Sequence, residues 1–149
     1  MRVLGIDLGT KRIGIALSNS DRTVATPYTV LTRSNDKEQD RKQIINIANE
    51  WEIATLVFGL PISLDGTLGP AAQRTKEEID ELQKLTNLEI HTFDERFTTV
   101  SAEQTLRDQN IGANKSRGLV DQVAAAIILQ AWLDTQLHEH SVPNKETTN

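Results

Sequence analysis

An apolar run at the start of the chain contains a single acidic residue and is closed by a glycine turn. The run begins at Val3, and Asp7 lies near its end, directly before Gly9 and Thr10. A second apolar run follows over residues 13–17, so the two together predict an antiparallel hairpin. A carboxylate buried without a partner is costly, so Asp7 requires a cation, a hydrogen-bond donor or a metal ion. The alternative is that Asp7 caps the turn through nearby backbone N–H groups.

The composition is typical of one soluble globular domain. A chain of 149 residues can bury one core, and none of its apolar runs reaches the length of a membrane span. The formal charge of −5 argues against a generally basic nucleic-acid-binding surface but allows a local basic patch. The absence of cysteine excludes a disulfide framework and a thiolate metal site. We expect a cytoplasmic domain over residues 1–138 and a disordered tail over 139–149.

The remaining apolar patterns predict an α/β fold with a mixed central sheet flanked by helices. The elements expected after the hairpin are strand 23–31, helix 36–51, strand 54–60, helix 71–85, strand 88–93, a short helix over about 101–112 and helix 115–137. The first three strands should be antiparallel, and the later strands, which alternate with helices, should be parallel. Pro27 in the third strand fits only at a sheet edge or at a bulge.

Three acidic residues lie where these elements end or begin. Asp7 ends the first strand, Glu95 follows the strand 88–93, and Asp121 lies near the start of the last helix. Functional sites in open α/β sheets assemble at the carboxyl ends of the strands. Three carboxylates there would repel one another without divalent cations, and oxygen ligands favour Mg²⁺ or Mn²⁺. Such ions activate water and stabilise the leaving oxygen of a phosphodiester.

Each of these acids also has a simpler interpretation that the sequence leaves open. Asp7 fits a turn residue, as described above. Glu95 fits an exposed acid at a strand end that pairs with Arg96. Asp121 fits an acid in the first turn of a helix, where the helix dipole favours negative charge.

Basic residues flank the acids and the loops beside them. They are Lys11, Arg12, Arg74, Arg96, Lys115 and Arg117. They can hold phosphates on either side of a cut bond, although exposed Lys and Arg side chains are usually only a solvated surface. The loop before helix 71–85 offers backbone donors that suit a phosphate, or it is a plain connection. Aromatic residues make up 4 % of the chain, which favours backbone contacts over base stacking.

Four motifs, taken together and in this order, resemble the YqgF family, also called RuvX. They are Gly5–Gly14, residues 59–70 with Gly59-Leu60-Pro61, Asp65-Gly66-Thr67 and Gly69-Pro70, Asp94–Thr99, and Asp121–Ala125. The resemblance covers nearly the whole chain apart from the tail. It implies an RNase H-like fold similar to that of Holliday junction resolvases. It also implies a nuclease that processes the 5′ end of pre-16S rRNA during ribosome biogenesis in the bacterial cytoplasm.

The resemblance also implies roles for individual residues and partners. Asp7, Glu95 and Asp121 match the acidic positions of the family and would be its catalytic residues and Mg²⁺ or Mn²⁺ ligands. Asp94 would either support these ligands or replace one of them. The partners would be pre-rRNA, structured DNA and ribosomal precursor particles, with no membrane. Junction resolution in DNA is an older proposal for the family.

Two further functions stay open on the sequence. Residues 6–10 also resemble the first phosphate motif of actin-like kinases and chaperone ATPases, which share this core. Those proteins enclose their nucleotide between two lobes, and 149 residues accommodate only one. The other possibility is a non-catalytic assembly factor that binds RNA or a protein, which the acidic balance of the chain fits.

Overall fold

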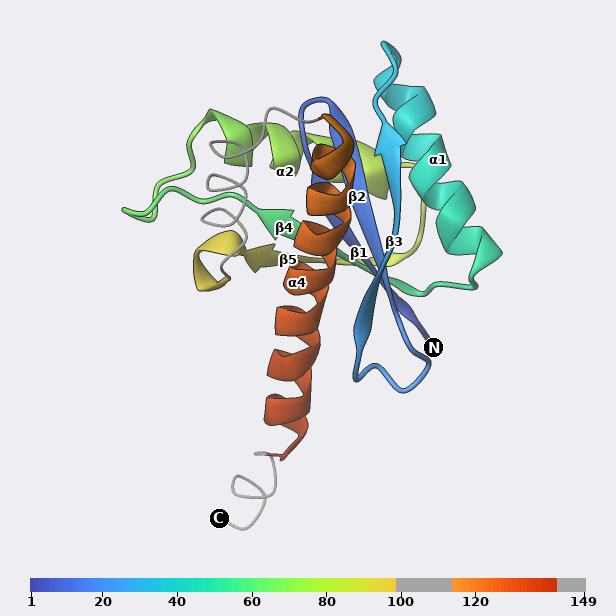
Figure 1. Cartoon of the computed structure of the whole chain (residues 1–149), viewed down its shortest axis with the longest axis vertical. Coiled ribbons are helices and arrows are strands. Elements are labelled where there is room, and N and C mark those ends of the chain that lie inside the picture. The colour runs from blue at the N-terminus through green and yellow to red at the C-terminus, as the bar shows by residue number, and fades with distance from the viewer. Residues whose placement is uncertain (99–113, 142–149) are drawn as a thin grey trace.

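The computed structural model describes residues 1–98 and 114–141, and these form three layers, with a central sheet between helices (Figure 1). The elements are β1 (Val3–Leu8), β2 (Arg12–Ser18), β3 (Ala25–Thr32), α1 (Lys37–Glu50), β4 (Thr55–Leu60), α2 (Pro70–Gln83), β5 (Glu89–Asp94), the 3-10 turn η1 (Glu95–Phe97) and α4 (Asn114–Ser141). The five strands lie in the order β3-β2-β1-β4-β5.

The directions of the strands place several strand ends at one edge of the sheet. β1 pairs antiparallel with β2, and β2 pairs antiparallel with β3. β4 runs parallel to both β1 and β5, which confirms the expected mixed sheet. The carboxyl ends of β1, β4 and β5 therefore meet at the same edge, where Asp7 ends one strand and Glu95 follows another.

The third strand accommodates its proline in both of the ways that the sequence predicted. β3 is an edge strand of the sheet. The register with β2 also shifts between Ile15 and Ala16, whose partners are Thr29 and Pro27. Tyr28 is the extra residue at this bulge, and it packs edge-on against Trp51 at the end of α1. A proline that cannot donate a ladder hydrogen bond is tolerated at such a position.

Two apolar cores lie on opposite faces of the sheet, because alternate residues of each strand point to opposite sides. On one face Leu4 and Ile6 pack with Ile44 of α1 and Leu82 of α2. On the other face Val3, Ala16 and Val57 pack with α4 through residues such as Ala125 and Leu129. Of the described helices, α1 and α2 thus cover one face and α4 covers the other (Figure 1).

Small residues on the sheet let α4 lie close to its backbone. A Cβ atom on Gly5 would come within 2.7 Å of Leu129 Cβ. A Cβ atom on Gly14 would lie against the backbone carbonyl of Asp121, well inside van der Waals contact. Since that carbonyl belongs to the helix itself, Gly14 fixes how closely the Asp121 turn of α4 approaches β2.

The helix boundaries largely follow the expected signals. Asp36 caps α1 by accepting hydrogen bonds from the backbone N–H groups of Glu38 and Gln39, and Pro70 is the first residue of α2. Residues 139–141, which were expected to begin the tail, continue α4. The rest of the tail and the expected helix over 101–112 lie outside the described residues, and disorder of the tail stays a prediction. Among the described residues, no helix has the length and apolarity to cross a membrane.

Candidate metal-dependent active site

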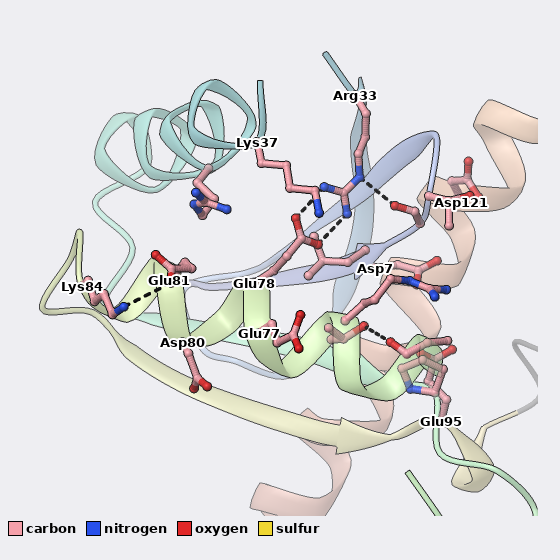
Figure 2. A pocket seen from close by; sticks show the side chains of 18 residues that line it. Asp7, Arg33, Lys37, Glu77, Glu78, Asp80, Glu81, Lys84, Glu95 and Asp121 are labelled. Carbon is pink, nitrogen blue, oxygen red and sulfur yellow. Dashed lines mark hydrogen bonds and ion pairs between the residues drawn. The ribbon is translucent and has the colours of Figure 1, made fainter. Parts of the chain in front are cut away.

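A groove of about 960 Å³ runs along the carboxyl edge of the sheet and between α1 and α2. Asp7, Glu95 and Asp121 all line it, as the sequence predicted. Figure 2 shows these three acids toward one end of the groove and Lys84 and Asp80 of α2 toward the other. Side chains that are far apart in the sequence therefore share one concave surface, which is the usual setting for a ligand or reaction site.

Glu95 is the most deeply placed of the three acids. It is the first residue of η1 and is 8 % exposed. Gly59 makes room for it, because a Cβ atom there would lie 3.0 Å from Glu95 Oε2. Burial raises the pKa of Glu95 to about 7, and repulsion from Asp7 and then Asp94 adds to the shift. The alternative that Glu95 is an exposed acid paired with Arg96 is wrong.

The side chain of Asp7 lies on the face of the sheet that α4 covers, because side chains alternate between the two faces along β1. It lies two residues after Gly5, which faces Leu129 of α4, and residues two apart on a strand share a face. Asp7 and Glu95 both line the groove, and repulsion from Asp7 helps to raise the pKa of Glu95. A cation bound between two such carboxylates would relieve this repulsion.

Asp121 meets a cation, as expected for an acid on the inward side of its helix. Arg12 Nε donates a hydrogen bond to Asp121 Oδ2 at 2.7 Å. The alternative of an acid in the first helical turn is wrong, because α4 begins at Asn114, about two turns earlier.

The donors present suit a hard divalent cation, although they are not gathered into a complete ligand cage. Among the described side chains, no three acidic or histidine groups lie close enough together to hold one metal ion. Asp7 and Glu95 nevertheless form an all-oxygen pair whose repulsion a cation would relieve. Asp121 lies on the wall of the same groove with its Oδ2 bound to Arg12. The pair fits Mg²⁺ or Mn²⁺, and Asp121 could be a third ligand only after its side chain moves from the position in which Arg12 holds it.

Asp94 and Arg96 form a separate pair beside the acids. The guanidinium of Arg96 binds both carboxylate oxygens of Asp94, with a shortest distance of 2.6 Å, and Asp94 also caps η1. The hydrogen bond from Arg96 lowers the pKa of Asp94 below its ordinary value. In this structure Arg96 binds Asp94 and does not line the groove, and its role in holding the substrate stays a prediction.

The other predicted cations are distributed unevenly around the groove. Arg74 on α2 lines it, whereas Lys11 is exposed in the hairpin turn and does not. Lys115 and Arg117 lie in the first turn of α4, and their side chains are outside the described part of the chain. The loop before α2 ends at Gly69, and no side chain caps the helix there, so its first backbone N–H groups suit a phosphate.

One ion pair that organises the groove has no signal in the sequence. Arg33 forms two hydrogen bonds to the Glu78 carboxylate at 2.6 and 2.7 Å and donates a third from Nε to the Gly9 carbonyl (Figure 2). Its backbone N–H also bonds to the Lys11 carbonyl. Arg33 thus ties the turn that follows Asp7 to α2. No local pattern connects residues 45 positions apart, so this pair could be found only from the fold.

The chain resembles known proteins over most of its length. Residues 1–135 match the family model described as "RuvX: Holliday junction resolvase". A relative from Anaeromyxobacter sp. (strain Fw109-5), named "Putative pre-16S rRNA nuclease", is 43 % identical over 90 % of this chain and 97 % of its own. A relative of the same name from Roseiflexus sp. (strain RS-1) is 39 % identical over 91 % of this chain and 95 % of its own.

The solved structures show the same architecture at low identity. The chain described as "T. thermophilus RuvC in complex with Holliday junction substrate" aligns with a TM-score of 0.60 and 11 % identity, over 92 % of this chain and 96 % of that one. A second one, described as "Thermus thermophilus RuvC structure", aligns with a TM-score of 0.54 and 12 % identity, over 93 % and 97 % of the two chains. This likeness confirms the expected RNase H-like fold.

Proposed function

The chain belongs to the RuvX family, and from that premise we propose that it is a metal-dependent nuclease in the 5′-end maturation of pre-16S rRNA. The observation that carries the proposal is the buried Glu95 beside Asp7 at the carboxyl edge of the sheet. A protein gains nothing in stability from two such carboxylates, since burial and repulsion both oppose their ionisation. Their arrangement is explained by a cation that binds both.

Asp7 and Glu95 would hold the ion, and Asp121 is the third candidate ligand. A bound divalent ion supplies an activated water and stabilises the charge that develops on the leaving oxygen. Glu95 must be ionised to bind a cation, and its pKa of about 7 sets the pH at which metal-free protein becomes ready to do so. The buried position of Glu95 and the packing of Gly59 against it hold its carboxylate in one place.

The groove would bind the nucleic-acid backbone through its cations and its helix start. Lys37 and Arg41 of α1 and Arg74 of α2 line it. These side chains can contact phosphates on either side of the scissile bond, together with the uncapped start of α2. Several acids of α2 lie among them, so a strand would be held at separated points rather than along a uniformly basic channel.

The biological setting that this proposal implies is the bacterial cytoplasm. The substrate would be the 5′ extension of pre-16S rRNA, either free or within a ribosomal precursor particle. The names of the relatives from Anaeromyxobacter and Roseiflexus support this choice. The second candidate is resolution of four-way DNA junctions, which the description of the matching family model favours.

A cleavage assay with Mn²⁺ separates these candidates. A precursor fragment of 16S rRNA and a four-way DNA junction are incubated in parallel with the protein, with EDTA and with the variant Asp7→Asn. We expect the RNA to be cut faster, and Asp7→Asn to be slower by about 1000-fold or more, because several kcal/mol of metal-based charge stabilisation is lost.

Each other outcome of this assay has a definite meaning. Faster cutting of the junction would assign the chain to DNA resolution. Cleavage by Asp7→Asn at the rate of the unaltered protein would remove Asp7 from the active site. Intact RNA and DNA in the presence of Mn²⁺ would leave a non-catalytic assembly factor as the better description.

A further inference from the structure

The ion pair between Arg12 and Asp121 joins a residue outside the groove lining to one that is part of it. Arg12 is the first residue of β2, and its Nε atom lies 2.7 Å from Asp121 Oδ2. The two side chains are 29 % and 21 % exposed, so solvent reaches both. Asp121 also lines the groove that contains Asp7 and Glu95. Asp121 therefore has a cationic partner and shares a groove with two other acidic residues.

The backbone that carries Asp121 cannot move closer to the sheet. Its carbonyl oxygen rests on Gly14, at a position where even one added carbon atom would clash. Residues 124 and 125 of the same helix are buried against the sheet. A change of partner by Asp121 therefore has to be a rotation of its side chain, with the helix fixed. Such a rotation involves few other contacts and is fast.

The pair is suited to an exchange of partners. Both side chains are partly exposed, so a phosphate can reach the guanidinium and replace the carboxylate. A guanidinium presents several N–H donors that match phosphate oxygens as well as carboxylate oxygens. While Arg12 holds it, the Asp121 carboxylate is not gathered with Asp7 and Glu95 into a group that could bind one ion, so to join them its side chain has to turn away from Arg12.

We propose that Arg12 is a substrate-sensing latch, which holds Asp121 until a phosphate of the nucleic acid takes its place and thereby releases Asp121 to the metal. The inference rests on the proposed nuclease function and adds a step to it. Substrate binding and completion of the metal ligands become coupled through one arginine. By thermodynamic linkage, the ion must strengthen nucleic-acid binding by the same factor as nucleic acid strengthens ion binding.

The latch predicts how RNA affinity changes among variants of the metal-free protein, and this can be tested without cleavage. In EDTA, binding of a short fluorescent single-stranded RNA is measured by anisotropy for the unaltered protein, Asp121→Asn, Arg12→Gln and the double variant. We expect Asp121→Asn to bind the RNA about 5-fold more tightly, because it sets Arg12 free, and this gain to vanish in the double variant. Glu77→Gln, which removes an exposed acid of the same groove, controls for the loss of one negative charge.

The reciprocal measurement concerns the metal in the absence of RNA. We expect Arg12→Gln to bind Mn²⁺ about 5-fold more tightly than the unaltered protein by calorimetry, because Asp121 no longer has a competing partner. Lys11→Gln removes the neighbouring positive charge, which is exposed in the hairpin turn, and should produce a smaller gain. Circular dichroism of each variant verifies that the fold is intact.

Two results would overturn the latch. One is a gain in RNA affinity on Asp121→Asn that is no larger than that of Glu77→Gln, or that persists in the double variant. The other is a Mn²⁺ affinity of Arg12→Gln that does not exceed that of Lys11→Gln. If the unaltered protein cuts RNA with Mn²⁺ while either result is obtained, the latch alone fails. If it neither cuts nor binds RNA, the proposed function fails with it.

Discussion

We expect Glu95→Gln to stabilise the metal-free protein at alkaline pH by up to about 3 kcal/mol while abolishing its metal-dependent cleavage. The gain in stability arises because the carboxyl of Glu95 is buried and faces Asp7, and these two effects raise its pKa to about 7. Glutamine has nearly the same shape and no charge to desolvate. The loss of cleavage arises because an amide is a much weaker ligand for a hard cation than a carboxylate.

The pH dependence of this gain has a definite sign. The folded protein holds the proton of Glu95 up to about pH 7, whereas an unfolded chain releases it near 4.5. The stability that this proton contributes is therefore fully present below about pH 4.5 and is lost as the pH rises through about 7. Glu95→Gln and the unaltered protein should be equally stable near pH 4.5, and their free energies of unfolding should diverge as the pH rises.

Urea unfolding in EDTA at a series of pH values measures this difference. Glu77→Gln, at an exposed position of the same groove, is the matched control and should differ from the unaltered protein by less than about 0.5 kcal/mol throughout. Added Mn²⁺ should stabilise the unaltered protein and reduce the advantage of Glu95→Gln, since the ion binds only when Glu95 is ionised. A difference that does not vary with pH would mean that Glu95 is neither buried nor opposed by Asp7.

The second large effect is expected at Gly14, where α4 rests on β2. Gly14→Ala places a carbon atom against the Asp121 carbonyl, and a backbone atom in a buried helix cannot move aside as a flexible side chain can. The helix must shift away from the small residues that it covers, which opens the core formed with Val57 and Leu129. We expect a loss of at least about 3 kcal/mol in the free energy of unfolding.

Gly69→Ala is the matched control for this substitution. A Cβ atom at Gly69 would meet only Ser63 Oγ at 3.3 Å, which is a side-chain atom of an exposed loop. Its unfolding free energy should stay within about 1 kcal/mol of that of the unaltered protein. Equal stability of Gly14→Ala and the unaltered protein would show that α4 does not lie on β2 as described.

The sequence predicted those features that depend on local pattern. The apolar runs around Asp7 and the turn at Gly9 were enough to place the hairpin, and the alternation of strands with helices was enough to predict a parallel half of the sheet. Pro27 was placed correctly, because a residue without an N–H group has few positions open to it in a sheet. The edge at which Asp7 and Glu95 meet followed from these directions.

The partners of the charged side chains could not be predicted in the same way. The sequence predicts that Arg96 contacts the substrate, but it does not show that the Arg96 guanidinium binds Asp94. The link from Arg33 to Glu78 joins α2 to a residue that the sequence placed in a polar turn, and only the packing of the layers brings them together. The fold determines which opposite charges pair, because several side chains with the same charged group are available for each partner.

The most direct test of the metal site is anomalous diffraction from crystals of the protein soaked in Mn²⁺. We expect a manganese peak in the groove with oxygens of Asp7 and Glu95 within about 2–2.5 Å of it, and no such peak in crystals of Asp7→Asn. A fully soaked crystal with manganese only at other positions, or with Glu95 still facing Asp7 and no ion near either, would contradict the assignment of this site.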